Sequence, residues 1–114
     1  MGVANLLGEK VDILSNMSIV DLESIKVKIL EILKFGFVQT SSHCKDQMRE
    51  RDFSMRDILK VLQTGEVKPG TADDDDAKMV FRVYGHDNEG EPLGVTVEIN
   101  ENLNRLNIIT GFGY

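Results

Sequence analysis

Residues 79–99 read M-V-F-R-V-Y-G-H-D-N-E-G-E-P-L-G-V-T-V-E-I, and this stretch determines the fold. Apolar residues recur at every second position on both sides of its centre, as they do in strands with one buried face. The centre, Gly85–Pro92, is rich in the residues that form turns. The stretch therefore predicts two antiparallel strands joined as a hairpin, with Met79, Phe81 and Val83 on one face.

A third strand is predicted downstream of the hairpin. Apolar and polar residues alternate again over residues 106–110, after a polar turn at residues 100–104. Sequential strands with short connections favour an antiparallel meander. Phe37–Thr40 is expected to be a short extended link that could add an edge strand, which gives a sheet of three to four strands.

Helices are predicted upstream of the strands. The first is expected over residues 18–35, because Ser18 can cap its start and Gly36 can end it. The second begins at Ser41 or Ser42 and runs to about Arg51. The third begins at Ser54, where Asp57 completes the start signal, and ends at Gly65. Residues 67–76 are expected to form a connecting loop.

This order of elements predicts an α+β fold. Two to three N-terminal helices are expected to pack on a three- to four-stranded antiparallel meander. The length of 114 residues fits one domain. We assign residues 18–114 to this domain and residues 1–17 to an N-terminal arm.

The composition indicates a soluble cytoplasmic protein. The sequence carries no signal peptide pattern and no apolar run long enough to cross a membrane. Its single cysteine, Cys44, excludes an internal disulfide and is expected to be a buried thiol. The net charge of −6 and the absence of a basic stripe count against tight, nonspecific polyanion binding.

No metal or cofactor site is predicted. Asp73–Asp76 lacks the glycine and the spaced ligands of a calcium loop, so a solvated acidic loop is expected. One cysteine and two scattered histidines do not form a zinc site.

A first candidate site lies in the second predicted helix. His43, Gln47 and Arg51 recur every four residues, so a helix would place them on one face. A histidine can exchange protons near neutral pH, and an arginine can stabilise charge on a phosphate. The alternative is an ordinary polar helix surface, and a single histidine favours that alternative.

A second candidate site lies on the first strand of the hairpin. Arg82, Tyr84 and His86 are spaced by two, so they would share a sheet face if the strand continues through Gly85. They could act together on a substrate, or they could be the mixed polar residues of a half-exposed strand. In the second case Tyr84 could lie in the core and His86 in the turn.

The sequence resembles a small bacterial domain family of unknown function. The resemblance is carried by S-x-H-C-x-x-Q-M-x-E-R-D-F-S at residues 41–54, by the hairpin of residues 79–99 and by a final N-I-I-T strand. It covers about residues 40–112. That family resembles BrnT-like and RelE/ParE-like toxins, whose partners are small zinc-finger or helix-turn-helix antitoxins. The resemblance implies a RelE/BrnT-like fold.

The same resemblance implies a function. RelE-like ribonucleases use basic and aromatic side chains on a sheet to cleave RNA without a metal. A toxin that cleaves RNA in this way is therefore the leading hypothesis, with an antitoxin and RNA as partners. His43 or His86 would move the proton, Arg51 and Arg82 would hold the phosphate, and Tyr84 would position the nucleotide.

The alternative is a non-catalytic protein-binding module with the same fold. Gln47 stands where the family usually has an arginine, and Asp52 where it usually has a glycine. Glutamine cannot replace a guanidinium as a bidentate phosphate ligand. If that arginine is catalytic in the family, this chain would be a weakened or inactive member.

Overall fold

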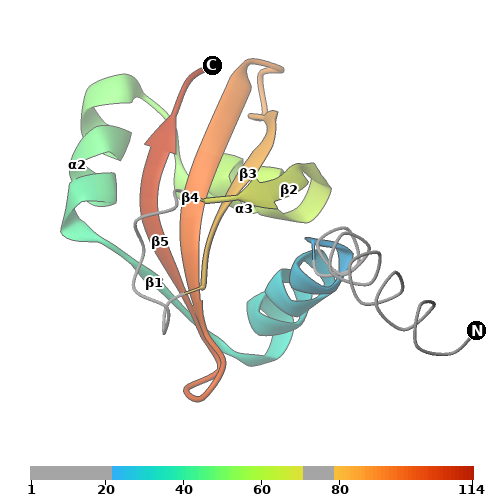
Figure 1. Cartoon of the computed structure of the whole chain (residues 1–114). Helices are drawn as coiled ribbons and strands as arrows, with labels where there is room; N and C mark the ends of the chain where they lie inside the picture. Colours follow the sequence, from blue (N-terminus) through green and yellow to red (C-terminus); the bar gives the residue numbers. More distant parts are fainter. Residues whose placement is uncertain (1–21, 71–78) are drawn as a thin grey trace, which may run out of the picture.

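The computed structural model describes residues 22–70 and 79–114 (Figure 1). The predicted arm at residues 1–17, the Ser18 helix start and the Asp73–Asp76 run lie outside these residues. A helix at residues 22–35 is followed by seven elements. They are β1 (Phe37–Thr40), α2 (Ser42–Arg51), α3 (Met55–Thr64), β2 (Glu66–Pro69), β3 (Met79–His86), β4 (Pro92–Asn100) and β5 (Arg105–Phe112).

Both predicted helix starts that lie in the described residues are confirmed. The Ser41 hydroxyl accepts a hydrogen bond from the Cys44 amide at 3.0 Å and caps α2. Ser54 and Asp57 form a reciprocal capping box at the start of α3. Such caps satisfy amides that have no partner within the helix, which is why serine at these positions predicts the boundary so well.

The predicted antiparallel meander is only part of the sheet. The sheet has five strands in the order β1-β5-β4-β3-β2. Strands β2 to β5 pair antiparallel, but β1 pairs parallel with β5, with Phe37 opposite Arg105. The prediction of a simple antiparallel sheet is therefore wrong. Five elements separate β1 from β5 in the sequence, and a long connection of this kind allows two strands to pair parallel, whereas a short turn does not.

Strand β2 lies in the segment that was predicted to be a loop. Glu66–Pro69 pairs with β3, and Val67 is buried opposite Val83. Only four residues long and ending in proline, β2 is too short and too polar to give an alternating pattern. The position of β2 depends on its pairing with β3 and not on a local sequence pattern.

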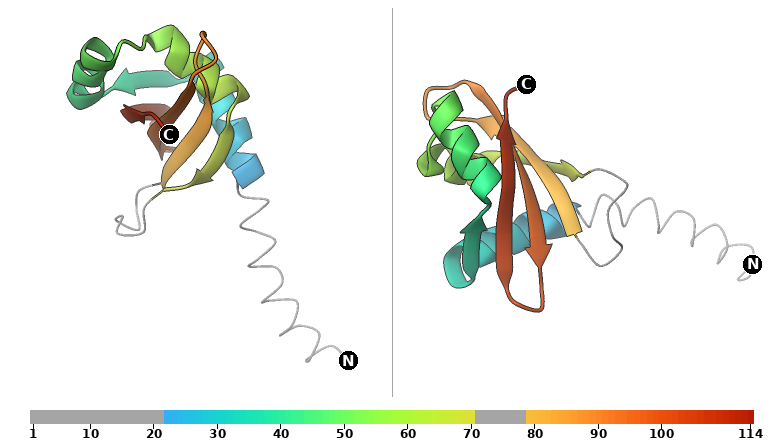
Figure 2. Two further views of the ribbon diagram at one scale, coloured as in Figure 1. Left: turned by 90° about the horizontal axis from the view of Figure 1, so that it is seen from above. Right: turned by 90° about the vertical axis from the view of Figure 1, so that its left-hand side faces the viewer.

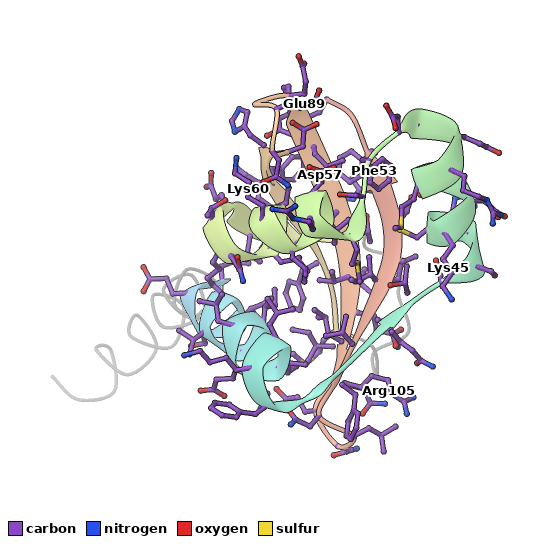
Figure 3. All side chains as sticks on the ribbon, turned by 180° about the vertical axis from the view of Figure 1, so that it is seen from behind. Lys45, Phe53, Asp57, Lys60, Glu89 and Arg105 are labelled. Atoms are coloured by element: carbon purple, nitrogen blue, oxygen red, sulfur yellow. The ribbon has the colours of Figure 1, made fainter. Side chains whose placement is uncertain are left out.

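The core lies between one face of the sheet and two helices. Figures 1 and 3 show helix 22–35 and α3 on the same side of the sheet. Helix 22–35 contributes Ile29 and Ile32, which are fully buried, and the sheet contributes Val83, Val95, Val97, Leu106 and Ile108. The other face of β3 and β4 carries no helix in the described residues. His86 is exposed on this face and Arg82 and Tyr84 are partly exposed, whereas Thr96 is buried.

Helix α2 lies beside the edge of the sheet rather than over its face (Figure 2). Strand β1 covers only the first half of β5, and the chain enters α2 at the point where the Ser41 amide bonds to the Ile108 carbonyl. Ile109 forms a bulge, because Thr96 pairs with Thr110 but Val97 pairs with Ile108. The Ser41 hydroxyl donates to the freed Ile109 carbonyl at 2.6 Å.

Candidate functional site

Side chains alternate between the two faces of the sheet along each strand, so every second residue points to the helix-free face. Val83 and Gly85 are buried toward the helices, so Arg82, Tyr84 and His86 point to the opposite face. In register with them, Gly94 lies between Tyr84 and Phe112 on the neighbouring strands. The structure thus brings together the three candidate residues predicted on this strand.

An aromatic cluster occupies one end of this face. The ring of Tyr84 packs edge-to-face against Phe112, with centroids 5.6 Å apart, and against Tyr114, at 5.1 Å. The Tyr114 hydroxyl donates to the Gly85 carbonyl at 2.9 Å, and this hydrogen bond holds the Tyr114 ring beside β3. Gly94 has no side chain to occupy the space below the Phe112 ring, so the ring can lie flat on the sheet.

Arg82 adds a cation to the aromatic cluster. Its guanidinium carbon lies 5.7 Å from the centre of the Phe112 ring, within cation–π range. The Arg82 Nε atom is buried and has no hydrogen-bond partner among the described residues. Arg82 is held mainly by stacking, and its guanidinium retains donor capacity for a ligand.

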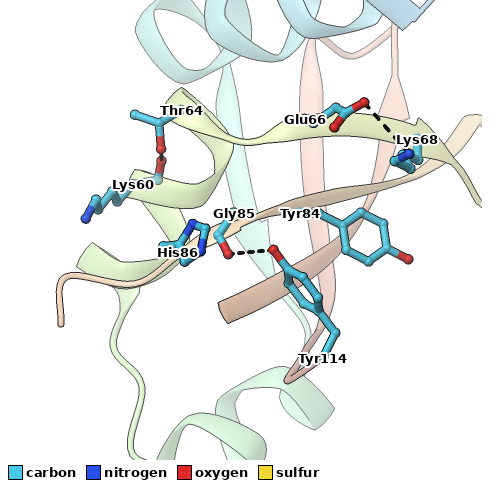
Figure 4. A pocket seen from close by; sticks show the side chains of 8 residues that line it. All are labelled: Lys60, Thr64, Glu66, Lys68, Tyr84, Gly85, His86 and Tyr114. Carbon is cyan, nitrogen blue, oxygen red and sulfur yellow. Dashed lines mark hydrogen bonds and ion pairs between the residues drawn. The ribbon is translucent and has the colours of Figure 1, made fainter. Parts of the chain in front are cut away.

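A hollow of about 710 Å³ opens next to the aromatic cluster (Figure 4). Its lining combines aromatic and cationic side chains: Lys60, Thr64, Glu66, Lys68, Tyr84, Gly85, His86 and Tyr114. Glu66 is paired with Lys68 at 3.8 Å, but both side chains are more than half exposed and the pair is weak. The hollow therefore offers a neutral-to-basic, aromatic surface.

Helix α3 fixes the turn that follows His86. Lys60 Nζ donates to the Asp87 carbonyl at 2.9 Å. The Asn88 amide and side chain both donate to Asp57 Oδ1 at 2.9 Å. Partial burial raises the pKa of Asp57, but the hydrogen bonds from Asn88 and Ser54 outweigh it and lower the pKa to about 2. The carboxylate is therefore a permanent anchor at neutral pH.

The comparisons with known proteins identify the family. The family model "Domain of unknown function (DUF4258)" matches residues 40–110. The chain belongs to this family. The match runs from the end of β1 into β5, so this DUF4258 domain includes α2, α3 and the hairpin, whereas Phe112 and Tyr114 lie beyond it.

A solved structure similar to this DUF4258 protein is that of conserved hypothetical protein HP0892 from Helicobacter pylori. It shares 13% sequence identity, covers 68% of this chain and 93% of its own, and superposes with a TM-score of 0.45. No curated protein matches the chain.

The predicted row of His43, Gln47 and Arg51 does not form one exposed face. His43 and Arg51 are exposed, but Gln47 is buried at 8% exposure. The three residues lie within an arc of about 80°, so rotation about the helix does not separate them. Gln47, in the middle of α2, contacts β5, whereas His43 and Arg51 lie at the two ends of the helix. Gln47 Oε1 accepts hydrogen bonds from the Gly111 amide at 3.0 Å and from the Thr110 hydroxyl at 2.6 Å.

The two candidate sites also remain separate. Arg51 lines a different hollow of about 350 Å³, together with Phe112 and acidic residues of the β3–β4 turn. His43 lies in the first turn of α2 and lines neither hollow. Of the predicted residues, only Tyr84 and His86 line the hollow of Figure 4. Arg82 does not line it but lies opposite the lining residue Lys68 in the sheet.

Several residues of the hollow escaped prediction. Lys60 is on α3 and Lys68 is on the unrecognised strand β2, and neither belongs to a motif. Tyr114 follows the last strand, but its placement depends on its hydrogen bond to Gly85. The clearest signal was the aromatic pair Phe112 and Tyr114 continuing the alternation of β5.

Within residues 22–70 and 79–114, no cluster of histidine, cysteine and acidic side chains has the geometry to hold a metal ion. No helix in this part of the chain has the length and apolar character to cross a lipid bilayer. Cys44 is fully buried, and burial raises the pKa of its thiol while the Gly111 backbone lowers it, so the thiol form dominates.

Proposed function

We propose that this protein is the RNA-cleaving toxin of a toxin–antitoxin pair and that it acts on single-stranded RNA with the helix-free face of its sheet. The observation that carries the proposal is the hollow that joins Tyr84, Tyr114 and His86 to Lys60 and Lys68. The resemblance to RelE- and BrnT-like toxins supports the same function.

Single-stranded RNA fits the composition of this face. Unpaired bases stack on aromatic rings, and each stacked base contributes about 1–3 kcal/mol. Tyr84 and Tyr114 present such rings, and Tyr114 is 59% exposed. Lys68 and Arg82, which pair in register on β2 and β3, would hold phosphate groups.

The proposed reaction needs no metal. His86 would remove the proton of the ribose 2′-hydroxyl, and the resulting oxygen would attack the adjacent phosphorus. A new bond from the 2′-oxygen to phosphorus would form as the bond to the 5′-oxygen breaks. A water molecule would protonate the leaving 5′-oxygen, and the proton taken up by His86 would return to solvent. The products are a 2′,3′-cyclic phosphate and a 5′-hydroxyl. Arg82 and Lys68 would stabilise the charge on the phosphorane.

Histidine variants test the assignment of the proton-transfer group. Induced expression in a bacterial host should arrest growth and degrade RNA, and His86→Ala should lower the cleavage rate about 100-fold or more. His43→Ala is the matched control, because His43 is exposed and does not line the hollow. Equal cleavage by His86→Ala and wild type would disprove the role of His86.

Arginine and tyrosine variants test the sheet face itself. Tyr84→Ala and Arg82→Ala should weaken binding of a fluorescent single-stranded RNA, and binding should fall steeply with salt. A protein with no salt-sensitive RNA binding and no toxicity would contradict the proposal.

The second candidate function is a non-catalytic protein-binding module. It is favoured by apolar side chains exposed beside β1, where Phe35 is 80% and Phe37 69% exposed. This function predicts no RNA binding at any salt concentration, and the same fluorescence titration therefore separates the two candidates.

A further inference from the structure

The two edges of the sheet differ in their capacity to accept another strand. At the β2 edge, the Gly70 amide bonds to the Val80 carbonyl, so alternation turns the backbone of Val67 and Pro69 outward. Proline has no N–H to donate and is typical of protected edges. Strand β1, at the other end of the strand order, contains no proline.

The outward backbone groups of β1 have no strand partner within residues 22–70 and 79–114. The amides of Phe37 and Ser41 bond to Asn104 and Ile108, so Phe37, Gln39 and Ser41 face β5. Val38 and Thr40 then direct their N–H and C=O groups away from the sheet. No other strand of the described residues pairs with this side of β1.

Exposed apolar side chains surround this edge. Phe35 is 80%, Phe37 69%, Leu103 49% and Val38 36% exposed. Leu103 lies in the β4–β5 turn, which the Phe37 amide joins to β1 through the Asn104 carbonyl at 2.9 Å. Apolar residues gathered in this way are typical of an interaction surface. We call Phe35, Phe37, Val38 and Leu103, with the outward backbone of β1, the β1 edge surface.

Cationic side chains stand at both ends of the β1 edge surface. Figure 3 shows Lys45 beyond the end of β1 that leads into α2, and Arg105 toward its other end. Lys34 is exposed just before β1. In α2, the carboxylate of Asp46 is paired with Arg49.

The cations at both ends of the β1 edge surface favour an acidic partner segment over a second copy of the chain. A second copy of the chain, paired antiparallel across a two-fold axis, would bring the cations at one end of β1 against those at the other end. Like charges placed opposite each other destabilise a strand pair. An extended segment of another protein with acidic residues at its ends would instead meet opposite charges.

We propose that the β1 edge surface binds an extended, apolar segment of a partner protein that carries acidic residues at both ends. The segment adds a sixth strand to the sheet. Its backbone bonds to Val38 and Thr40, its apolar side chains cover Phe37 and Val38, and its carboxylates pair with Lys45 and Arg105. The inference is independent of the proposed RNA cleavage, because none of these residues lines the hollow.

The probe is a short fluorescent peptide of alternating valine and threonine with paired glutamates at both ends. Its matched control replaces the glutamates by lysines. Fluorescence anisotropy with the full chain should give at least about 10-fold tighter binding of the glutamate peptide. Reversal of the charges in the Lys45→Glu, Arg105→Glu double variant should switch the preference to the lysine peptide.

A proline variant tests strand addition separately from charge. Val38→Pro removes an N–H that β5 does not use, so the fold is retained while affinity for the glutamate peptide falls about 10-fold or more. Val38→Thr keeps the N–H and should bind like wild type. A far-ultraviolet spectrum of Val38→Pro checks the fold.

Three results of the peptide titrations would overturn the proposal. They are no binding of the glutamate peptide, equal binding of both peptides, and undiminished binding by folded Val38→Pro. Dimerisation of the wild type that Val38→Pro abolishes, seen by analytical ultracentrifugation, would assign the edge to a second copy and would also overturn it.

Discussion

Gln47 acts as an acceptor that arginine could not replace. Strand β1 pairs only with the first half of β5, so it offers no acceptor to the buried Gly111 amide in the second half. The side-chain oxygen of Gln47 accepts this hydrogen bond instead. A guanidinium carries donors only and cannot accept this bond. Gln47 therefore makes a structural contact in this chain that an arginine could not make.

Replacement of Gln47 by leucine should destabilise the protein by about 1–3 kcal/mol, because the buried Gly111 amide loses its acceptor. Gln47→Arg should destabilise it for the same reason. Urea unfolding followed by circular dichroism measures the loss. Gln63→Leu is the matched control, since Gln63 is an exposed glutamine of α3 and should change stability by less than about 0.5 kcal/mol. An unchanged stability of Gln47→Leu would contradict this role.

Gly94→Ala should disturb the aromatic cluster, because its Cβ would collide with the Phe112 ring. Overpacking of this kind costs about 1–3 kcal/mol. Gly113→Ala is the control, since a Cβ there has no atom within 4 Å. Urea unfolding gives the stability difference, and near-ultraviolet circular dichroism reports the tyrosine environment. A Gly94→Ala spectrum identical to wild type would show that Phe112 does not need this space.

Asp57 links two elements, since it caps α3 and holds the β3–β4 turn beside His86. Asp57→Asn should lower stability at neutral pH by about 1–2 kcal/mol, because the charged acceptor of these bonds is lost. Chemical unfolding at pH 7 measures this difference. Asp46→Asn, on the exposed surface of α2, is the control and should have a small effect.

The stability difference between wild type and Asp57→Asn should change with pH in a defined direction. The pKa of Asp57 is lowered from 3.8 to about 2 in the folded state, so its contribution is present above about pH 4. That contribution is lost as the pH falls toward 2. The stability difference between wild type and Asp57→Asn should therefore shrink on acidification from about pH 5 to pH 2. A constant difference would show that Asp57 does not titrate with folding.

The elements were predictable where a local signal existed. Ser41, Ser54 and Asp57 fixed two helix starts, because capping needs only residues close in sequence. Alternation gave β3, β4 and β5 within one or two residues. The pairing of β1 and the existence of β2 depend on strands that are distant in sequence, and no local pattern encodes either.

The candidate site, like the elements, was predictable only where local geometry determines the position of a side chain. Residues 82, 84 and 86 share a face because strand geometry requires it. The row on α2 was misjudged, because helical spacing does not reveal which side of a helix meets the sheet. Lys60, Lys68 and Tyr114 reach the hollow only through tertiary packing.

At the scale of the whole molecule, helix 22–35 and the sheet share one hydrophobic cluster. Gln47 and Asp57 contact different elements and share no hydrogen-bond partner. Their stability losses should therefore add in a Gln47→Leu, Asp57→Asn double variant to within about 0.5 kcal/mol. Unfolding should follow one transition by fluorescence and by circular dichroism. Two separate transitions would divide the molecule into independent units.

The parallel contact between β1 and β5 has a consequence for how the chain folds. The Ser41–Ile109 hydrogen bond joins residues 68 positions apart, so β1 has no partner until almost the whole domain has left the ribosome. The β3–β4 hairpin can form earlier from local contacts, before β5 has left the ribosome. Because closing a long loop costs entropy before any contact repays it, docking of β1 should be a late and slow step. Until β1 docks, the backbone groups of Phe37 and Gln39 that face β5 in the folded protein have no strand partner and are open to incorrect pairing.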